Sequence, residues 1–376
     1  MSPLSKADLA RYARHLALAE IGHPGQEKLR AARVLIVGAG GLGSPAALYL
    51  AAGGLGTLGL VDFDRVDVSN LQRQVLFDTA GIGRQKSEAA RERLLALNPT
   101  IRVNAHTLEL RASNVLAVLR EYDVVLDGTD RLSTRYIVND ACVILRKPLV
   151  SAAIHRFEGQ AMTYVPGKGP CYRCLFADAT RAVVPNCAEA GVLGVLPGVL
   201  GTIQATEAIK LITGIGEPLI GRLLTYDALH MRFEEFAFTR RADCAVCGDH
   251  PTIAAPFDPP LAAHETPMSA TDILRFSPSE TQALLGKPGY VIVDVREPYE
   301  FDAGHLPGSL HIPLGDLPAR FAEIPSDATP VFICRSGGRS LNACAFALQA
   351  GAAKAINLEG GLKAWAAQID PSLQVA

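Results

Sequence analysis

The chain has 376 residues, of which 49% are hydrophobic and 20% charged, and its 36 basic and 38 acidic residues nearly balance. That length suggests two or three domains, and a formal charge of −2 gives no whole-chain electrostatic reason to expect nucleic-acid binding. Eight cysteines are too few for a small disulfide-stapled scaffold, so their spacing matters more than their number. The first fifteen residues show no apolar signal-peptide core, and we therefore expect a cytoplasmic protein.

The segment from Val34 to Val61 carries no charged residue and by length alone could span a membrane. It also contains Pro45 and eight glycines, which divide it into a strand, a glycine-rich turn, a helix and a second strand. We therefore expect no membrane segment here, but the buried start of an α/β fold.

Short apolar runs that end in Gly, Asp or Ser alternate with helical patterns through the first two thirds of the chain. The expected strands there lie at 33–41, 57–64, 124–130 and 148–153, and the expected helices at 84–98 and 202–214. This alternation predicts a Rossmann-like α/β fold whose mostly parallel sheet is covered on both faces.

A second, smaller α/β unit is expected beyond a proline-rich stretch. Its strands are expected at 289–296, 309–314 and 330–336, and its helix at 340–351. We therefore predict domains at 1–250 and 270–376, joined by a semi-rigid linker at 251–269.

The sequence Gly38-Ala39-Gly40-Gly41-Leu42-Gly43 follows the first expected strand and opens a helix. Glycines let a phosphate approach the backbone, and Asp62, 19 residues beyond Gly43, could accept hydrogen bonds from a ribose. On this motif alone a nicotinamide-dependent dehydrogenase would be favoured.

The residues after Asp62 suit a triphosphate better than a dinucleotide. Arg73 and Lys86 could neutralise a departing pyrophosphate, and Asp130, at the end of the next strand, could hold Mg²⁺. Each of these could instead be a solvated surface charge, and for Lys86 alone that would be the better interpretation.

Seven motifs together resemble the MoeB/ThiF type of ubiquitin-activating-like adenylyltransferase, over most of residues 1–250. They are RYARH (11–15), GAGGLGS (38–44), DFDRVDVSNLQRQ (62–74), GIGRQK (81–86), GTD (128–130), CYRC (171–174) and NCAEAGVLG (186–194). The resemblance implies that the chain binds ATP and Mg²⁺ and forms a homodimer in which Arg14 reaches the partner's phosphates. The implied ATP contacts are Gly41, Asp62, Ser69, Asn70, Leu71, Gln72, Arg73, Lys86, Asp130 and Arg131. The family usually has Asn where this chain has Arg131.

Two Cys-x2-Cys pairs, Cys171 with Cys174 and Cys244 with Cys247, are separated by 69 residues. Four thiolates supplied two by two are typical of structural zinc, although one pair alone could be redox-active. Cys187 stands apart beside a polar, glycine-rich stretch. It is a candidate nucleophile or a small buried filler, and the resemblance favours an acceptor cysteine.

Cys334 lies directly between an expected strand and an expected helix, where backbone N–H groups and a helix N-terminus would stabilise an anionic sulfur. Together with residues 294–313 and 357–365, the loop Cys334-Arg335-Ser336-Gly337-Gly338-Arg339 resembles the rhodanese sulfurtransferase domain over about 270–372. The Cys-x4-Arg spacing suits a persulfide, and we expect Arg335 and Arg339 to face an anion. Cys142 and Cys344 are expected in the core.

Both resemblances together imply an enzyme that adenylates the C-terminal Gly-Gly of a ubiquitin-like sulfur carrier and then transfers sulfur from a Cys334 persulfide. The carrier of molybdopterin synthase is favoured over those of thiamine, cysteine or tRNA thiolation, with a cysteine desulfurase as an upstream donor. Cys187 would form a thioester with the carrier or a disulfide with Cys334. The alternatives are an NAD-dependent oxidoreductase and a non-catalytic carrier-binding scaffold.

Overall fold

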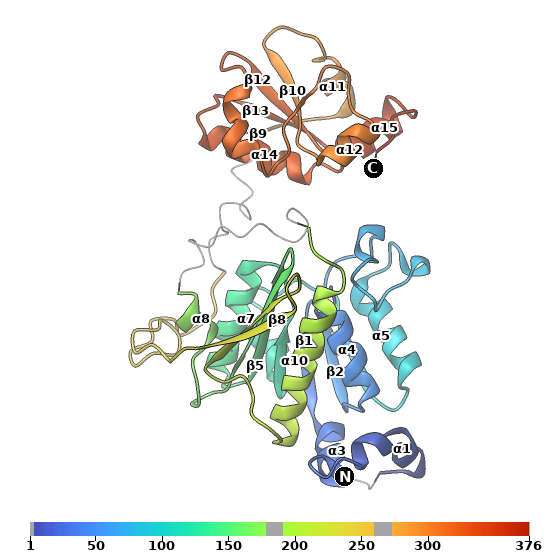
Figure 1. Ribbon diagram of the computed structural model, residues 1–376, viewed down its shortest axis with the longest axis vertical. Coiled ribbons are helices and arrows are strands. Elements are labelled where there is room, and N and C mark those ends of the chain that lie inside the picture. The colour runs from blue at the N-terminus through green and yellow to red at the C-terminus, as the bar shows by residue number, and fades with distance from the viewer. Residues whose placement is uncertain (1–3, 178–190, 259–272, 376) are drawn as a thin grey trace. The chain divides into compact units, whose positions relative to one another are not determined.

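The charge-free segment folds as two strands and a helix, β1 (Arg33–Val37), α4 (Gly43–Ala52) and β2 (Thr57–Val61), as its glycines and proline predict. The computed structural model describes residues 4–177, 191–258 and 273–375. Among these residues, none of the helices combines the length and the apolar character needed to cross a bilayer. The chain divides into two units, Met1–Ala262 and Ala263–Ala376 (Figure 1).

The first unit is built on an eight-stranded sheet in the order β3-β2-β1-β4-β5-β6-β7-β8. The five neighbours β3, β2, β1, β4 and β5 pair in parallel, whereas β5, β6, β7 and β8 pair antiparallel. The remaining strands are β3 (Arg102–His106), β4 (Val124–Asp127), β5 (Leu149–His155), β6 (Glu158–Tyr164), β7 (Arg222–Asp227) and β8 (Arg232–Ala237). The expected α/β class is confirmed, and the antiparallel extension is a feature that the sequence patterns did not predict.

Helices cover both faces of the parallel half of this sheet. Val34 and Ile36 of β1 pack with α4, α5 and α10, whereas Leu35 and Val37 pack on the opposite face with α6 and α7. Alternate residues of one strand therefore enter two separate cores, as expected of a strand buried on both sides. The other helices are α1 (Lys6–Arg11), α2 (Ala13–Leu16), α3 (Gly22–Ala31), α5 (Lys86–Leu97), α6 (Val115–Arg120), α7 (Leu132–Ile144), α8 (Tyr172–Leu175) and α10 (Leu196–Thr213), with 3₁₀ turns η1 (Val68–Asn70) and η2 (Thr79–Gly81).

The second unit contains a five-stranded parallel sheet in the order β11-β10-β12-β13-β9. Its elements are β9 (Ile273–Phe276), α11 (Pro278–Gln282), β10 (Tyr290–Asp294), α12 (Pro298–Ala303), β11 (Leu310–His311), α13 (Leu317–Arg320), η3 (Phe321–Glu323), β12 (Thr329–Ile333), α14 (Gly338–Gln349), β13 (Ala355–Leu358) and α15 (Gly361–Gln368). Two cores again lie on opposite faces, one around Phe332 and one around Trp365.

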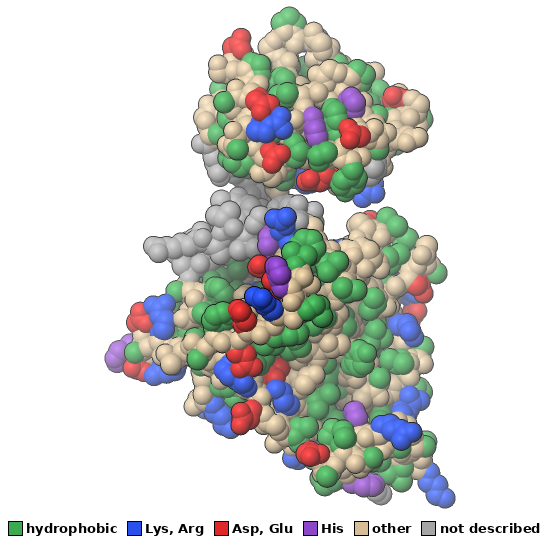
Figure 2. All heavy atoms as spheres, viewed as in Figure 1, with side chains coloured by type: hydrophobic (Ala, Val, Ile, Leu, Met, Phe, Trp, Pro, Cys, Tyr) green, Lys and Arg blue, Asp and Glu red, His purple; other side chains and the backbone are tan. Residues whose placement is uncertain are grey.

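Acidic and basic side chains are interspersed over the face of the molecule seen in Figure 2. Neither the acidic nor the basic side chains gather there into a continuous patch, so this face is not divided into two oppositely charged regions.

Candidate functional site

The glycine-rich loop after β1 turns the chain sharply into α4. Gly38 has a φ of +90°, which residues with side chains rarely adopt, and a Cβ on Gly43 would lie 1.9 Å from the carbonyl oxygen of Gly38. No side chain caps α4 at Leu42, so an anion on this loop would meet the positive end of the helix dipole.

Asp62, which follows β2, joins that strand to the glycine-rich loop. Its carboxylate accepts hydrogen bonds from the backbone N–H groups of Ala39 and Asp64, both at 2.9 Å. Burial raises the pKa of Asp62, and the nearby Lys86 ammonium opposes this shift. Each carboxylate oxygen has a second lone pair, so Asp62 can still accept a ribose hydroxyl.

Two cations lie near the loop, and neither is a freely solvated surface charge. Lys86 at the start of α5 is only 5% exposed, and its Nζ lies 3.2 Å from a carboxylate oxygen of Asp64. The surface interpretation of Lys86 is therefore wrong. Arg73 is half-buried and donates to the carbonyl of Ser69 at 3.0 Å, and among the described residues no carboxylate forms an ion pair with it.

The short turn η1 presents the remaining polar residues of this loop. The Asp67 carboxylate accepts from the Ser69 N–H at 2.8 Å and so caps the turn. Ser69 and Gln72 are exposed, whereas Asn70 and Leu71 are half-buried. The contacts that we predict between these four residues and ATP stay predictions.

Asp130 is exposed on the turn after β4, and a buried ion pair fixes that turn. Asp127 accepts from the Thr129 N–H at 3.1 Å and lies 3.1 Å from Nε of Arg135, which itself donates to the Thr129 carbonyl at 2.8 Å. Burial raises the pKa of Asp127, although the Arg135 charge lowers it. The sequence analysis did not identify Asp127 and Arg135. A carboxylate within an otherwise apolar strand is a signal that could have indicated Asp127.

The structure thus brings together the glycine-rich loop, Asp62, Arg73, Lys86 and the β4 turn at the carboxyl edge of the sheet. A Cβ on Gly41 would lie 3.6 Å from Arg73, and one on Gly38 would lie 3.0 Å from the carbonyl oxygen of Gly128. Arg131, the next residue after Asp130, lies over the ring of Phe63 and pairs with Glu109.

Arg14 lies on the short helix α2, where it is exposed and lines an open cavity of about 580 Å³ together with Tyr49 and Thr206. The helix is held by the neighbours of Arg14, because Tyr12 accepts from Asn98 at 2.9 Å and His15 bonds to Gln26 at 3.0 Å. The reach of Arg14 to a partner's phosphates stays a prediction.

The two cysteine pairs converge on one point. The Sγ atoms of Cys171, Cys174, Cys244 and Cys247 lie within 4.8 Å of one another, with Cys171 to Cys244 at 3.7 Å and Cys174 to Cys247 at 3.4 Å. Four sulfurs at zinc-bonding distance would be about 3.8 Å apart in a tetrahedron, so the arrangement fits zinc. Arg173 anchors one pair through a bidentate bond to buried Asp140 at 2.7 and 2.8 Å.

Cys187 lies outside the described residues, which resume at Gly191. The segment beyond it packs on the nucleotide loops, because a Cβ on Gly194 would lie 2.5 Å from the Gln72 carbonyl oxygen and Pro197 covers Gly41. Cys142 and Cys344 are fully buried in the cores, where burial raises the pKa of both thiols.

Cys334 is 1% exposed at the end of β12, in the turn that leads into α14. The Gly337 N–H donates to its Sγ at 3.1 Å, and the hydroxyl of the buried Ser340 donates at 3.2 Å. Gly337 takes the left-handed φ of +94° that lets its N–H point inward. Two donors therefore converge on one sulfur and hold it in place at the start of α14.

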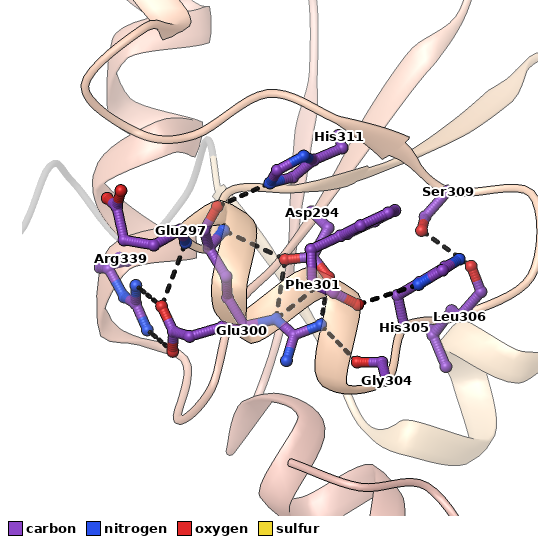
Figure 3. Close-up of polar contacts among 11 residues, drawn as sticks. Asp294, Glu297, Glu300, Phe301, Gly304, His305, Leu306, Ser309, His311 and Arg339 are labelled. Atoms are coloured by element: carbon purple, nitrogen blue, oxygen red, sulfur yellow. Dashed lines mark hydrogen bonds and ion pairs between the residues drawn. The ribbon is translucent and has the colours of Figure 1, made fainter. Parts of the chain in front are cut away.

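Arg339 of the sulfur loop is paired with a carboxylate, and its role toward an anion stays a prediction. Its guanidinium forms a bidentate pair with Glu300 of α12 at 2.5 and 2.6 Å (Figure 3). Burial tends to raise the pKa of Glu300, but bonds from Arg339 and from the Glu297 N–H lower it overall. Arg335 is half-buried, and its Nε has no hydrogen-bond partner within the described part of the chain.

A second buried pair supports the same helix. Arg296, which is fully buried, binds Asp294 at 2.7 Å and donates to the Gly304 carbonyl at 2.8 Å. On the outer side, His305 and His311 stack on the two sides of Phe301, with ring centroids 3.8 and 4.2 Å away (Figure 3). These contacts fix α12, and thereby Glu300, beside the sulfur loop.

The family comparisons divide the chain in two. Residues 12–246 match the ThiF family, and residues 277–368 match the rhodanese-like domain.

Proteins with both parts are similar over nearly the whole chain. The "Probable adenylyltransferase/sulfurtransferase MoeZ" of Mycobacterium tuberculosis (strain CDC 1551 / Oshkosh) is 43% identical over 99% of this chain and 96% of its own length. The "Adenylyltransferase and sulfurtransferase MOCS3" of Drosophila virilis is 41% identical over 99% of this chain and 86% of its own.

Among solved structures, E. coli MccB with ATP is similar at a TM-score of 0.57 and 26% identity, covering 65% of this chain and 75% of that one. Neither an oxidoreductase nor a non-catalytic scaffold finds support among these similarities.

Proposed function

The chain belongs to the ThiF family and carries a rhodanese-like domain C-terminal to the part that matches this family. We therefore propose that it activates and thiolates one carrier protein. The carrier's C-terminal Gly-Gly carboxylate attacks the α-phosphate of ATP, which gives an acyl-adenylate and releases pyrophosphate. The observation that carries the proposal is the presence in one chain of a glycine-rich loop tied to Asp62 and a buried cysteine whose sulfur accepts two hydrogen bonds.

The first step needs no general base. A C-terminal carboxyl has an ordinary pKa near 3.5, so it is ionised at neutral pH. The barrier is its repulsion by the phosphates, and catalysis reduces to positioning and charge compensation. Arg73 and Lys86 supply positive charge at the crevice, and Asp130 would hold the Mg²⁺ that neutralises the departing pyrophosphate.

The second step uses Cys334 in its persulfide form. The outer sulfur attacks the acyl carbon and AMP leaves, so that carrier and enzyme are joined through an acyl disulfide. Attack by a second thiol on the enzyme sulfur of Cys334 breaks the S–S bond and releases the carrier thiocarboxylate. We assign this thiol to Cys187. The resulting Cys187–Cys334 disulfide must be reduced by an external thiol before a new sulfur is loaded.

We further propose that the carrier is that of molybdopterin synthase, that a cysteine desulfurase loads Cys334, and that the enzyme is a cytoplasmic homodimer with Arg14 acting across its interface. The four-cysteine cluster would hold zinc that clamps the end of the first unit to its body.

Intact-mass measurement of candidate carriers tests the proposal. After incubation with the enzyme, ATP, Mg²⁺ and a sulfur donor, the true carrier gains the mass difference between sulfur and oxygen. Omission of ATP should abolish the gain. If every Gly-Gly carrier keeps its mass while the enzyme turns over NAD, the proposal is wrong.

A further inference from the structure

Three side chains from three different strand ends meet at the carboxyl edge of the large sheet. Phe63 follows β2, Glu109 follows β3 and Arg131 follows β4. The Arg131 guanidinium carbon lies 4.7 Å from the centroid of the Phe63 ring, and its Nη1 lies 2.7 Å from a carboxylate oxygen of Glu109.

This contact lies at the carboxyl edge of the sheet, where a nucleotide is expected. Successive strands extend the sheet from β1 toward β3 and then, with β4, on the other side of β1, although all four strands are parallel. Ligands of such sheets bind at this switch point in the strand order. Arg131 comes from one side of β1, whereas Phe63 and Glu109 come from the other. The glycine-rich loop begins between them, at the end of β1.

Charge argues against a phosphate role for Arg131. The Glu109 carboxylate pairs with its guanidinium and is shared with Arg111 at 2.6 and 3.0 Å, so the charge of Arg131 is partly compensated. Arg73, by contrast, has a carbonyl partner and no carboxylate partner within the described part of the chain. A guanidinium that is paired at its edge still keeps two flat faces, which stack on aromatic rings.

One face of Arg131 is covered and the other is open. Phe63 lies against the first, while 47% of the side chain remains exposed to solvent. Asp62, where we expect the ribose, directly precedes Phe63 in the chain. A base attached to that ribose would therefore lie beside the open face.

We propose that Arg131, oriented by Phe63 and Glu109, is the stacking platform for the purine base of bound ATP. This inference rests on the proposed ATP site. Planarity, and not charge, is what the platform contributes, so lysine cannot replace this arginine.

The test compares ATP with inorganic tripolyphosphate, which carries the phosphates without the base, by calorimetry on the full chain. Arg131→Lys and Arg131→Ala should each weaken ATP binding about tenfold, as expected for loss of one base stack, and should change tripolyphosphate binding less than about twofold. Arg33→Ala is the matched control, because it removes an equally exposed arginine, paired with Asp123 at the opposite end of β1, and should leave both affinities unchanged. Melting temperature and metal content must equal those of the wild type.

The inference is overturned if Arg131→Lys binds ATP as tightly as the wild type, or if ATP and tripolyphosphate weaken equally. Its failure is distinguishable from failure of the proposed function. A wild-type chain that binds ATP but thiolates no carrier would sink only the function, whereas a chain that binds no ATP would sink both.

Discussion

The loop after β1 and the loop after β12 share one construction and differ in the charged side chains around them. Each follows a buried parallel strand and enters a helix, β1 into α4 and β12 into α14. The loop after β1 carries no charged side chain, and cations from elsewhere, Arg73 and Lys86, lie near it. The loop after β12 contains its own sulfur and two arginines, Arg335 and Arg339, of which Arg339 pairs with Glu300.

The difference matches the charge of the two ligands. A triphosphate brings several negative charges and needs cations whose charge is not fully compensated, whereas a single sulfur anion is held by two hydrogen-bond donors. A strand–loop–helix turn therefore does not by itself determine the ligand. The ion pairs around the turn decide it.

The largest effect is expected from Cys334→Ser, which removes the sulfur that only the second loop supplies. Carrier thiocarboxylate should fall below detection, while pyrophosphate exchange stays at the wild-type rate because the first loop is intact. Cys344→Ala, a change at another buried cysteine of the same unit, is the control and should retain both reactions. Normal thiocarboxylate from Cys334→Ser with the physiological donor would refute the division of labour.

Asp130→Ala should impair the reaction at the first loop, carrier adenylation, and leave the second loop unchanged. Loss of the metal-binding carboxylate should slow carrier adenylation by about 100- to 1,000-fold, the usual effect of removing one electrostatic group from a transition state. Alkylation of Cys334 by iodoacetamide should be unchanged. Asp123→Ala, an exposed carboxylate just before the same strand, should adenylate normally. Wild-type adenylation by Asp130→Ala would remove the assignment of the ATP site.

Zinc removal should destabilise the first unit and leave the second unit unchanged. Cys244→Ser should lose the bound metal and lower the melting temperature of the first unit, because structural zinc contributes directly to folding free energy. The second unit should melt unchanged, with Cys334 equally reactive. Cys142→Ala, a buried cysteine outside the cluster, should keep its zinc. Metal retention in Cys244→Ser, measured by elemental analysis, would contradict a four-thiolate site.

Glu300→Gln tests whether the ion pair matters to the sulfur loop. Removing one partner of a largely buried pair should destabilise the second unit by about 3 kcal/mol and release the charge of Arg339. Glu323→Gln, which breaks an exposed pair with Arg320, should cost less than about 1 kcal/mol. Equal melting temperatures for the two variants would show that the Glu300 pair is not structurally important.

The smallest effect is a difference in pH dependence between the loops. The pKa of Glu300 is lowered in the fold, so its stabilising contribution is present above the ordinary value near 4.3 and is lost as the pH falls through the lowered value. The pKa of Asp62 is raised by burial, so the first unit should lose stability as the pH rises from about 3.9 through the raised value. Glu300→Gln and Asp62→Asn should flatten the respective melting profiles, and profiles unchanged from the wild type would contradict both assignments.

The sequence alone determined the features that depend on neighbours along the chain. The order of strands and helices, the glycine-rich loop and the position of Cys334 before a helix all follow from residues close in sequence, whose conformations are set by local sterics and periodicity. The paired cysteines were also identifiable, because zinc requires a fixed ligand spacing.

Only the tertiary structure decided which charges are compensated. Arg339 meets Glu300, which lies 39 residues earlier, and Arg131 meets Glu109, which lies 22 residues earlier. Burial likewise distinguished Lys86 from a surface lysine. Electrostatic energy depends on distance and solvent exposure in space, which a linear pattern does not contain, so the folded chain alone shows which arginines meet a carboxylate.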